Sequence, residues 1–168
     1  MLLGSVGACR STDTPKTNES AAPSVSAPAP DARDAAEQAA LAAYRGMWQA
    51  YAKAGLTANP NEPNLPKFAG GNALQYLRNG LTAYRRKGQI LKGEYISNPQ
   101  VANVSLAATP RTVALTDCVD DTKFLVYTAS GQPINDTTGG RRATRATATD
   151  LAEGWRVTSF GVQEVGTC

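Results

Sequence analysis

The C-terminal half of the chain alternates between apolar and polar positions, and turn residues interrupt this pattern at short intervals. A period of two places successive side chains on opposite faces of a sheet, while clusters of Gly, Pro, Asn and Asp mark strand ends. The pattern predicts a curved antiparallel sheet of five to six strands. The expected strands are residues 89–97, 101–108, 112–119, 123–128, 142–150 and 155–165.

The strand expected at residues 142–150 differs from the others in its composition. It alternates between threonine, alanine and arginine and carries no large apolar residue. Such a strand has little to bury on either face. We therefore expect it at an edge of the sheet, or with water on both of its faces.

A first amphipathic helix is predicted from Asp34 to about Ala54, because apolar residues recur there every three or four positions. Asp34 and Glu37 have the spacing of a capping box, and Gly55 is a typical stop. Alanines in the apolar stripe should let the helix lie close to a sheet. The stripe and its neighbours comprise Ala36, Ala40, Leu41, Tyr44, Met47, Trp48 and Tyr51.

A second helix is predicted over residues 72–87, after a proline-rich loop at 56–71 that holds at most one short turn, at 65–68. Asn72 and Gln75 repeat the capping spacing, and Gly88 ends the helix. The basic run at residues 85–87 is explained by the favourable interaction of cations with a helix C-terminus. The alternative is contact with anionic lipid headgroups.

Helices that precede an antiparallel sheet predict an α+β domain over residues 34–168, with two helices packed on the sheet. The long first helix, the order of the elements and the Gly-Trp-Arg-Val at 154–157 resemble the superfamily typified by nuclear transport factor two. The resemblance is greatest to secreted and lipoprotein members from actinobacteria. It implies a cone-shaped fold with a pocket between helix and sheet, and it implies no particular activity.

The N-terminal segment differs in composition from the domain. Residues 10–33 are rich in Ser, Thr, Pro and Ala, which predicts a disordered tether. Val6-Gly7-Ala8-Cys9 just before it resembles a bacterial lipobox. The resemblance implies that residues 1–9 are the end of a signal peptide and that Cys9 carries lipid, including palmitate, on the extracytoplasmic face of the cell membrane. The alternative is a cysteine in a short flexible extension.

The remaining cysteines form an even pair if Cys9 is the lipid site. Cys118 and Cys168 would then be oxidised to a disulfide in an exported protein. The alternative is a buried free thiol at Cys118 and a frayed C-terminus.

The composition excludes several kinds of chemistry. The chain has no histidine, which removes His-based catalytic triads, imidazole bases and His metal sites, and it has no CxxC pair. We therefore expect no metal and no cofactor. The balance of 17 Lys+Arg against 14 Asp+Glu is too mild to indicate nucleic-acid binding. No run of 18 apolar residues is present to form an ordinary membrane-spanning helix.

The expected ligand pocket involves Tyr44, Trp48, Tyr51 and Asp117. The main prediction is a non-catalytic module that binds a small apolar ligand or a protein. An oligomerising component of an envelope transport or conjugation assembly is the alternative, and an exposed apolar patch on the outer sheet face would favour it.

A third possibility is an enzyme of the isomerase or dehydratase type. In it, Asp117 would act with a tyrosine donor inside an apolar pocket. A deep, closed pocket with a buried carboxylate would favour this interpretation. The tyrosines considered as donors are Tyr44, Tyr51, Tyr95 and Tyr127.

Overall fold

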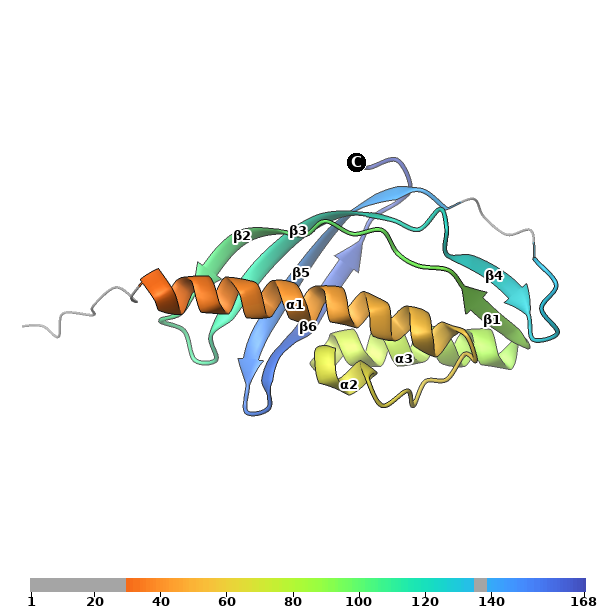
Figure 1. Ribbon diagram of the computed structural model, residues 1–168, viewed down its shortest axis with the longest axis horizontal. Coiled ribbons are helices and arrows are strands. Elements are labelled where there is room, and N and C mark those ends of the chain that lie inside the picture. Colours follow the sequence, from red (N-terminus) through yellow and green to blue (C-terminus); the bar gives the residue numbers. More distant parts are fainter. Residues whose placement is uncertain (1–29, 135–138) are drawn as a thin grey trace, which may run out of the picture.

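The computed structural model describes residues 30–134 and 139–168, which form an α+β domain (Figure 1). Cys9 and residues 10–29 lie outside the described part, so the lipid site and most of the tether stay predictions. The helices are α1 (Pro30–Gly55), α2 (Leu65–Phe68) and α3 (Gly71–Arg86). The strands are β1 (Gln89–Lys92), β2 (Gln100–Ser105), β3 (Thr112–Asp120), β4 (Leu125–Thr128), β5 (Arg141–Leu151) and β6 (Gly154–Val162).

The six strands are antiparallel, as expected, but they are divided between two sheets. One sheet has the order β2-β3-β5-β6, and the other pairs β1 with β4. The chain leaves the large sheet after β3, where Phe124 N donates to Asp121 O in a tight turn. An isolated bridge between Ile96 and Asp120 connects the segment after β1 to the end of β3.

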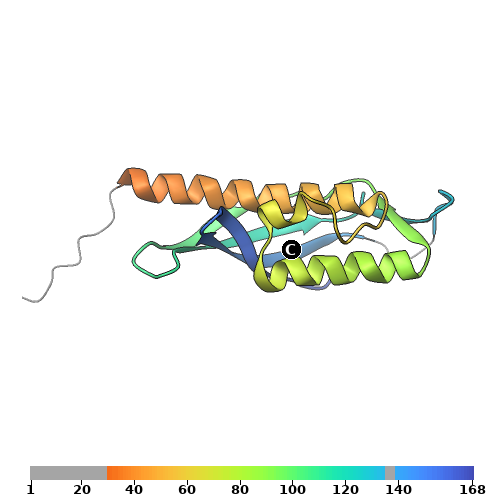
Figure 2. The same cartoon turned by 90° about the horizontal axis from the view of Figure 1, so that it is seen from below.

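Helices α1 and α3 lie on the same face of the four-stranded sheet (Figures 1 and 2). Both helices contact β6, and α2 sits between them in the sequence and also touches β6. Figure 2 shows α1 and α3 side by side with the strands behind them. Among the described residues, no helix is long and apolar enough to cross a membrane.

The core forms between the apolar stripe of α1 and the inner face of the large sheet. Tyr44 and Met47 are fully buried, and the alanines Ala36, Ala40 and Ala54 are buried with them. This confirms that the stripe faces the core. The sheet contributes Val113, Leu115, Val119, Ala146, Ala148 and Val157, and α3 contributes Ala73, Leu77 and Leu81.

Strand β5 lies in the centre of the large sheet, between β3 and β6, so the prediction of an edge or doubly exposed strand was wrong. Its inward side chains Thr144, Ala146 and Ala148 are buried. Small residues can occupy the centre here because α1 supplies the bulk from the opposite side, through Tyr44 and Met47.

The helix starts differ from the capping predictions. Helix α1 begins at Pro30, a residue suited to a first helical turn, so Asp34 lies inside the helix. Glu37 pairs instead with Arg33, at 2.9 Å and a spacing of four residues. Helix α3 begins after Gly70, where no side chain caps the helix. The short turn expected at residues 65–68 is confirmed as α2.

The disulfide between Cys118 and Cys168 is present, with Cα atoms 5.9 Å apart. It holds the C-terminal segment along the start of β5. Gly166 N donates to Arg141 O at 2.8 Å, and Ala143 N donates to Thr167 Oγ1 at 2.9 Å. The chain end is therefore fixed beside the sheet and is not frayed.

Candidate functional site

A pocket of about 570 Å³ lies between α1, α3 and the inner face of the large sheet. This volume is within the range of about 300–1,000 Å³ that is usual for small-molecule sites. The helices and the sheet both contribute to its wall, so the fold itself creates the space. The lining residues are Trp48, Tyr51, Tyr76, Leu77, Asn79, Gly80, Tyr84, Tyr95, Val119, Asp121, Arg142, Phe160, Val162, Gln163 and Glu164.

Aromatic rings form much of the wall. The Trp48 and Tyr95 rings are tilted by 40° with centroids 4.5 Å apart, and Trp48 meets the Phe160 ring edge-on at 5.5 Å. Tyr76 lies edge-on to Phe160 at 5.3 Å and is 69% exposed, so it stands where the pocket reaches the surface. Such rings offer a large apolar contact area at a low cost in conformational entropy.

An ion pair provides the charged part of the pocket. Arg142 Nε donates to Asp121 Oδ2 at 3.0 Å, and Arg142 Nη1 donates to Gln163 O at 3.4 Å. The other carboxylate oxygen, Asp121 Oδ1, accepts from Gly140 N at 2.6 Å. Both oxygens of Asp121 are therefore engaged by the protein. The arrangement supplies a polar wall, and Glu164 adds a second carboxylate to the lining.

Tyr51 and Tyr95 face the pocket in their neutral form. Burial raises the pKa of each phenol well above its ordinary value, since removal from water disfavours the phenolate. Tyr51 points toward α3, where a Cβ built on Gly80 would come within 3.0 Å of Tyr51 Oη. The absence of a side chain at Gly80 thus keeps this part of the pocket open.

A smaller hollow of about 220 Å³ extends the site toward β4. It shares five lining residues with the main pocket and adds apolar wall from Phe124 and Val126. The shared residues are Tyr51, Tyr84, Tyr95, Asp121 and Arg142. The two spaces together suit an elongated ligand better than a compact one.

The predicted pocket residues divide into two groups. Trp48 and Tyr51 line the pocket, whereas Tyr44 and Asp117 lie outside its lining. Tyr44 is completely buried, and burial, followed by the nearby Asp117 carboxylate, raises the pKa of its phenol. Asp117 Oδ1 accepts from Asn98 N at 2.9 Å.

The structure thus brings Tyr44 and Asp117 together, but inside the protein. Tyr44 Oη, Trp48 Nε1 and Asp117 Oδ2 are buried and make no hydrogen bond within the described residues. Tyr127, another donor considered for catalysis, lies on β4 beneath Lys92, whose Nζ is 4.6 Å from the ring centroid. The pair of Tyr44 and Asp117 is therefore not presented to the pocket, as an acid–base pair acting on a pocket ligand would have to be.

Sequence reasoning missed several residues of the pocket, chiefly Tyr76, Asp121, Arg142 and Phe160. Asp121 lies between the strands expected at residues 112–119 and 123–128, and Arg142 lies on the strand expected at a sheet edge or with water on both faces. One feature of the sequence could have indicated the pocket: Tyr76 is a large aromatic residue that stands next to Leu77 on α3, outside the apolar face of that helix. No local pattern, however, indicates that Asp121 and Arg142, 21 residues apart, meet.

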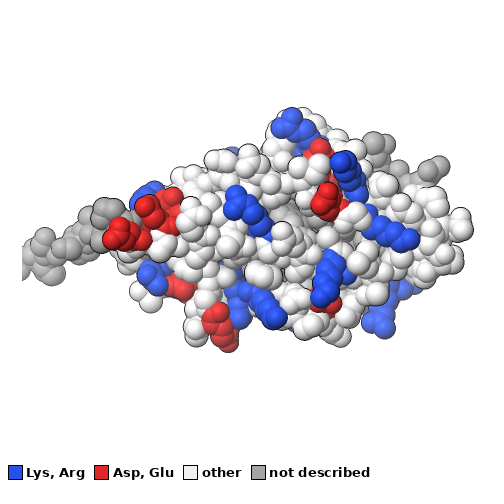
Figure 3. All heavy atoms as spheres, in the orientation of Figure 1, with Lys and Arg blue, Asp and Glu red and all other residues white. Residues whose placement is uncertain are grey.

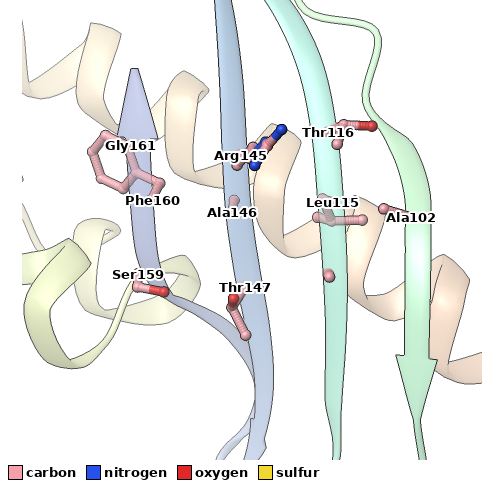
Figure 4. Close-up of a pocket in the computed structure, with 10 residues that line it drawn as sticks. Ala102, Leu115, Thr116, Arg145, Ala146, Thr147, Ser159, Phe160 and Gly161 are labelled. Atoms are coloured by element: carbon pink, nitrogen blue, oxygen red, sulfur yellow. The ribbon is translucent and has the colours of Figure 1, made fainter. Parts of the chain in front are cut away.

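A second hollow of about 660 Å³ lies on the opposite face of the large sheet, where Figure 4 shows the helices behind the strands. Its outward-facing side chains are small or polar, including Thr116, Arg145, Thr147 and Ser159. None of the exposed large apolar residues of the described chain lines it. Within the described residues, this hollow is therefore lined without any of the exposed large apolar side chains that would favour an assembly surface.

Within the described part of the chain, no three His, Cys, Asp or Glu residues lie together in a way that could hold a metal ion.

Comparisons with known proteins support the fold alone. No family model and no curated protein matches the chain. Among solved structures, the chain is similar to the intermembrane-space region of the chloroplast protein ARC6, with a TM-score of 0.57 and 16% sequence identity. The match covers 76% of this chain and 95% of that one. At this identity it indicates a similar arrangement of helices and strands and carries no statement about activity.

Proposed function

We propose that the protein is a lipid-anchored extracytoplasmic module that binds a small, largely apolar ligand between its helices and its large sheet. The observation that carries the proposal is the aromatic pocket of about 570 Å³. Its rings supply apolar contact area, and Arg142 supplies N–H donors at one wall. We further propose a cone-shaped fold of the nuclear-transport-factor-two-like type, which a pocket in this position supports.

Binding without catalysis is favoured by the positions of the two aspartates, Asp117 and Asp121. Asp121 is held by Arg142 and Gly140, and Asp117 lies outside the pocket lining. The proposed location, the extracytoplasmic face of the membrane with lipid at Cys9, is supported by the lipobox-like sequence and by the disulfide, which is typical of exported proteins. The alternative, a part of an envelope assembly, would be favoured by an exposed apolar patch on the outer sheet face, and none of the exposed large apolar residues of the described chain lines the hollow there.

Filling the pocket from α3 tests the proposal. Gly80→Leu places a branched side chain against Tyr51 Oη, where even a Cβ would lie at 3.0 Å. The neutral fluorescent probe N-phenyl-1-naphthylamine should bind the unmodified protein with enhanced emission. Gly80→Leu should weaken that binding at least about tenfold, which corresponds to about 1.4 kcal/mol.

The matched control is Ala83→Leu, which adds a similar side chain to an exposed position of the same helix. It should bind the probe like the unmodified protein. Equal binding by all three proteins would show that the probe lies elsewhere and would contradict the proposed site. Thermal unfolding of each variant separates loss of the pocket from loss of the fold.

A further inference from the structure

Three separate segments place basic residues around the two-stranded sheet of β1 and β4, with Arg85 to Lys87 beside one end of this sheet and Lys92 and Lys123 at the other. Arg85, Arg86 and Lys87 end α3, and the turn after them lies beside the end of β4, because Ala129 N donates to Gly88 O at 2.8 Å. Lys92 on β1 pairs in register with Leu125 on β4, and Lys123 lies two residues before Leu125. We call this region the basic end. It comprises Arg85, Arg86, Lys87, Lys92 and Lys123 with Leu56 and Leu125.

Two exposed leucines lie among these cations. Leu125 is 44% exposed and is the first residue of β4, two residues after Lys123. Leu56 is 51% exposed and directly follows Gly55, which packs closely on β1 and Phe124, since a Cβ built on it would lie 2.8 Å from Leu91 Cβ and 3.4 Å from the Phe124 ring. Both leucines thus lie on the same end of the domain as the basic residues.

Asp120 lies near Lys123, but salt bridges do not neutralise the basic end. Within residues 30–134 and 139–168, none of its five cations forms a salt bridge. Glu62 is engaged by Lys53 at 3.4 Å, and Glu94 lines a small hollow beside α1 with Arg45. Figure 3 shows Lys and Arg side chains over the half of the molecule that holds β1 and β4, with some Asp and Glu side chains among them.

We infer that the basic end docks onto the surface of an anionic membrane, with Leu56 and Leu125 entering the headgroup region. Clustered Lys and Arg are attracted to the negative potential of acidic lipids, and each contributes about a fivefold gain in affinity. Exposed leucines add apolar contact with the acyl boundary. A nucleic acid would use the cations but would leave the leucines without a partner.

The position of the basic end is compatible with an anchor on the same chain. Helix α1 spans about 39 Å at 1.5 Å per residue, and the basic end lies beyond its C-terminus. About 20 residues separate Cys9 from Pro30, and extended they reach about 70 Å. An anchored chain can therefore bring this end of the domain to the membrane that holds its lipid.

Vesicle flotation tests the inference with the 168-residue chain produced without lipid and with its disulfide formed. Vesicles made of equal parts phosphatidylcholine and phosphatidylglycerol should float the protein, whereas pure phosphatidylcholine should not. The triple variant Arg85→Gln, Arg86→Gln, Lys87→Gln should lose about 100-fold in affinity for the acidic vesicles. The pair Leu56→Ser, Leu125→Ser should lose about tenfold or more.

Arg145→Gln is the matched control, because Arg145 is an exposed cation on the outer sheet face. It should float like the unmodified protein. Equal flotation with neutral and acidic vesicles overturns the inference, and so does an unchanged affinity in the triple variant. The surface would instead be assigned to a polyanion by a third outcome. In it, the protein does not float with vesicles but binds heparin, and this binding is weakened in the triple cation variant and unchanged in the leucine pair. Binding of N-phenyl-1-naphthylamine should be unaffected in the triple variant and in Arg145→Gln, because the residues changed there lie outside the lining of both parts of the pocket.

Discussion

Removal of the disulfide should destabilise the domain by several kcal/mol, because the bond closes a long loop. Cys118 and Cys168 are separated by 50 residues, and the chain-entropy relation gives about 4 kcal/mol for a loop of that length. For a domain of this size, such a loss lowers the melting temperature by roughly 10–15 °C. Cys118→Ser and Cys168→Ser should each have this effect, and the double variant should be no less stable than either one.

Differential scanning calorimetry of the exported protein measures the effect, and a reductant added to the unmodified protein should reproduce it. The hydrogen bonds of Gly166 and Thr167 to β5 remain available in every variant, so the difference reports the covalent link. A non-reducing peptide map with both thiols free would refute the pairing. A change of melting temperature below about 2 °C would refute the estimate from loop entropy, but it would not contradict the presence of the disulfide.

The remaining predictions concern helix packing and alkaline stability. A Cβ built on Gly46 of α1 would lie 2.4 Å from the Phe68 ring of α2, so Gly46→Ala should destabilise the domain by about 1–3 kcal/mol in urea unfolding. In a Phe68→Ala background the same change should stabilise by up to about 1 kcal/mol through helix propensity, and destabilisation in both backgrounds would contradict the assigned contact. Tyr44, Tyr51 and Tyr95 have a raised pKa in the folded protein. Their contribution to the stability of the fold is therefore complete below the unfolded pKa of about 10 and is lost as the pH rises above it, because the unfolded chain then ionises first. Absorbance titration at 295 nm should show phenols that ionise only with unfolding, whereas ordinary titration of all six tyrosines would disprove their burial.

Sequence periodicity predicted those parts of the fold that depend on local pattern. The stripe of α1 is buried because its spacing of three and four residues places Tyr44, Met47 and Tyr51 on one face. The alternation of β3 and β6 likewise gives their inward residues, such as Val113 and Val157. The cysteine pairing rested on counting residues and on the inferred export of the protein, and the structure confirms it.

Strand order and the pocket could not be predicted, because they depend on contacts between distant segments. Nothing within residues 142–150 indicates a central strand, since the bulk that packs on its alanines belongs to α1. The chain turns at Asp121, and β4 then pairs with β1 and not with the large sheet. The Asp121 side chain lines the pocket, where it accepts a hydrogen bond from Arg142. A sequence shows that such a residue follows a strand, but not which remote side chain it meets.

Native mass spectrometry of the protein extracted from membranes with detergent tests the central claim most directly. The proposal predicts that the unmodified protein and Ala83→Leu carry one added small molecule of the same mass, and that Gly80→Leu, with its pocket filled, does not. The spectrum also gives the mass of any lipid on Cys9, because that modification survives denaturation while a pocket ligand is lost. An unmodified protein without a bound molecule, or an added mass that persists in Gly80→Leu, would contradict a ligand site between the helices and the sheet.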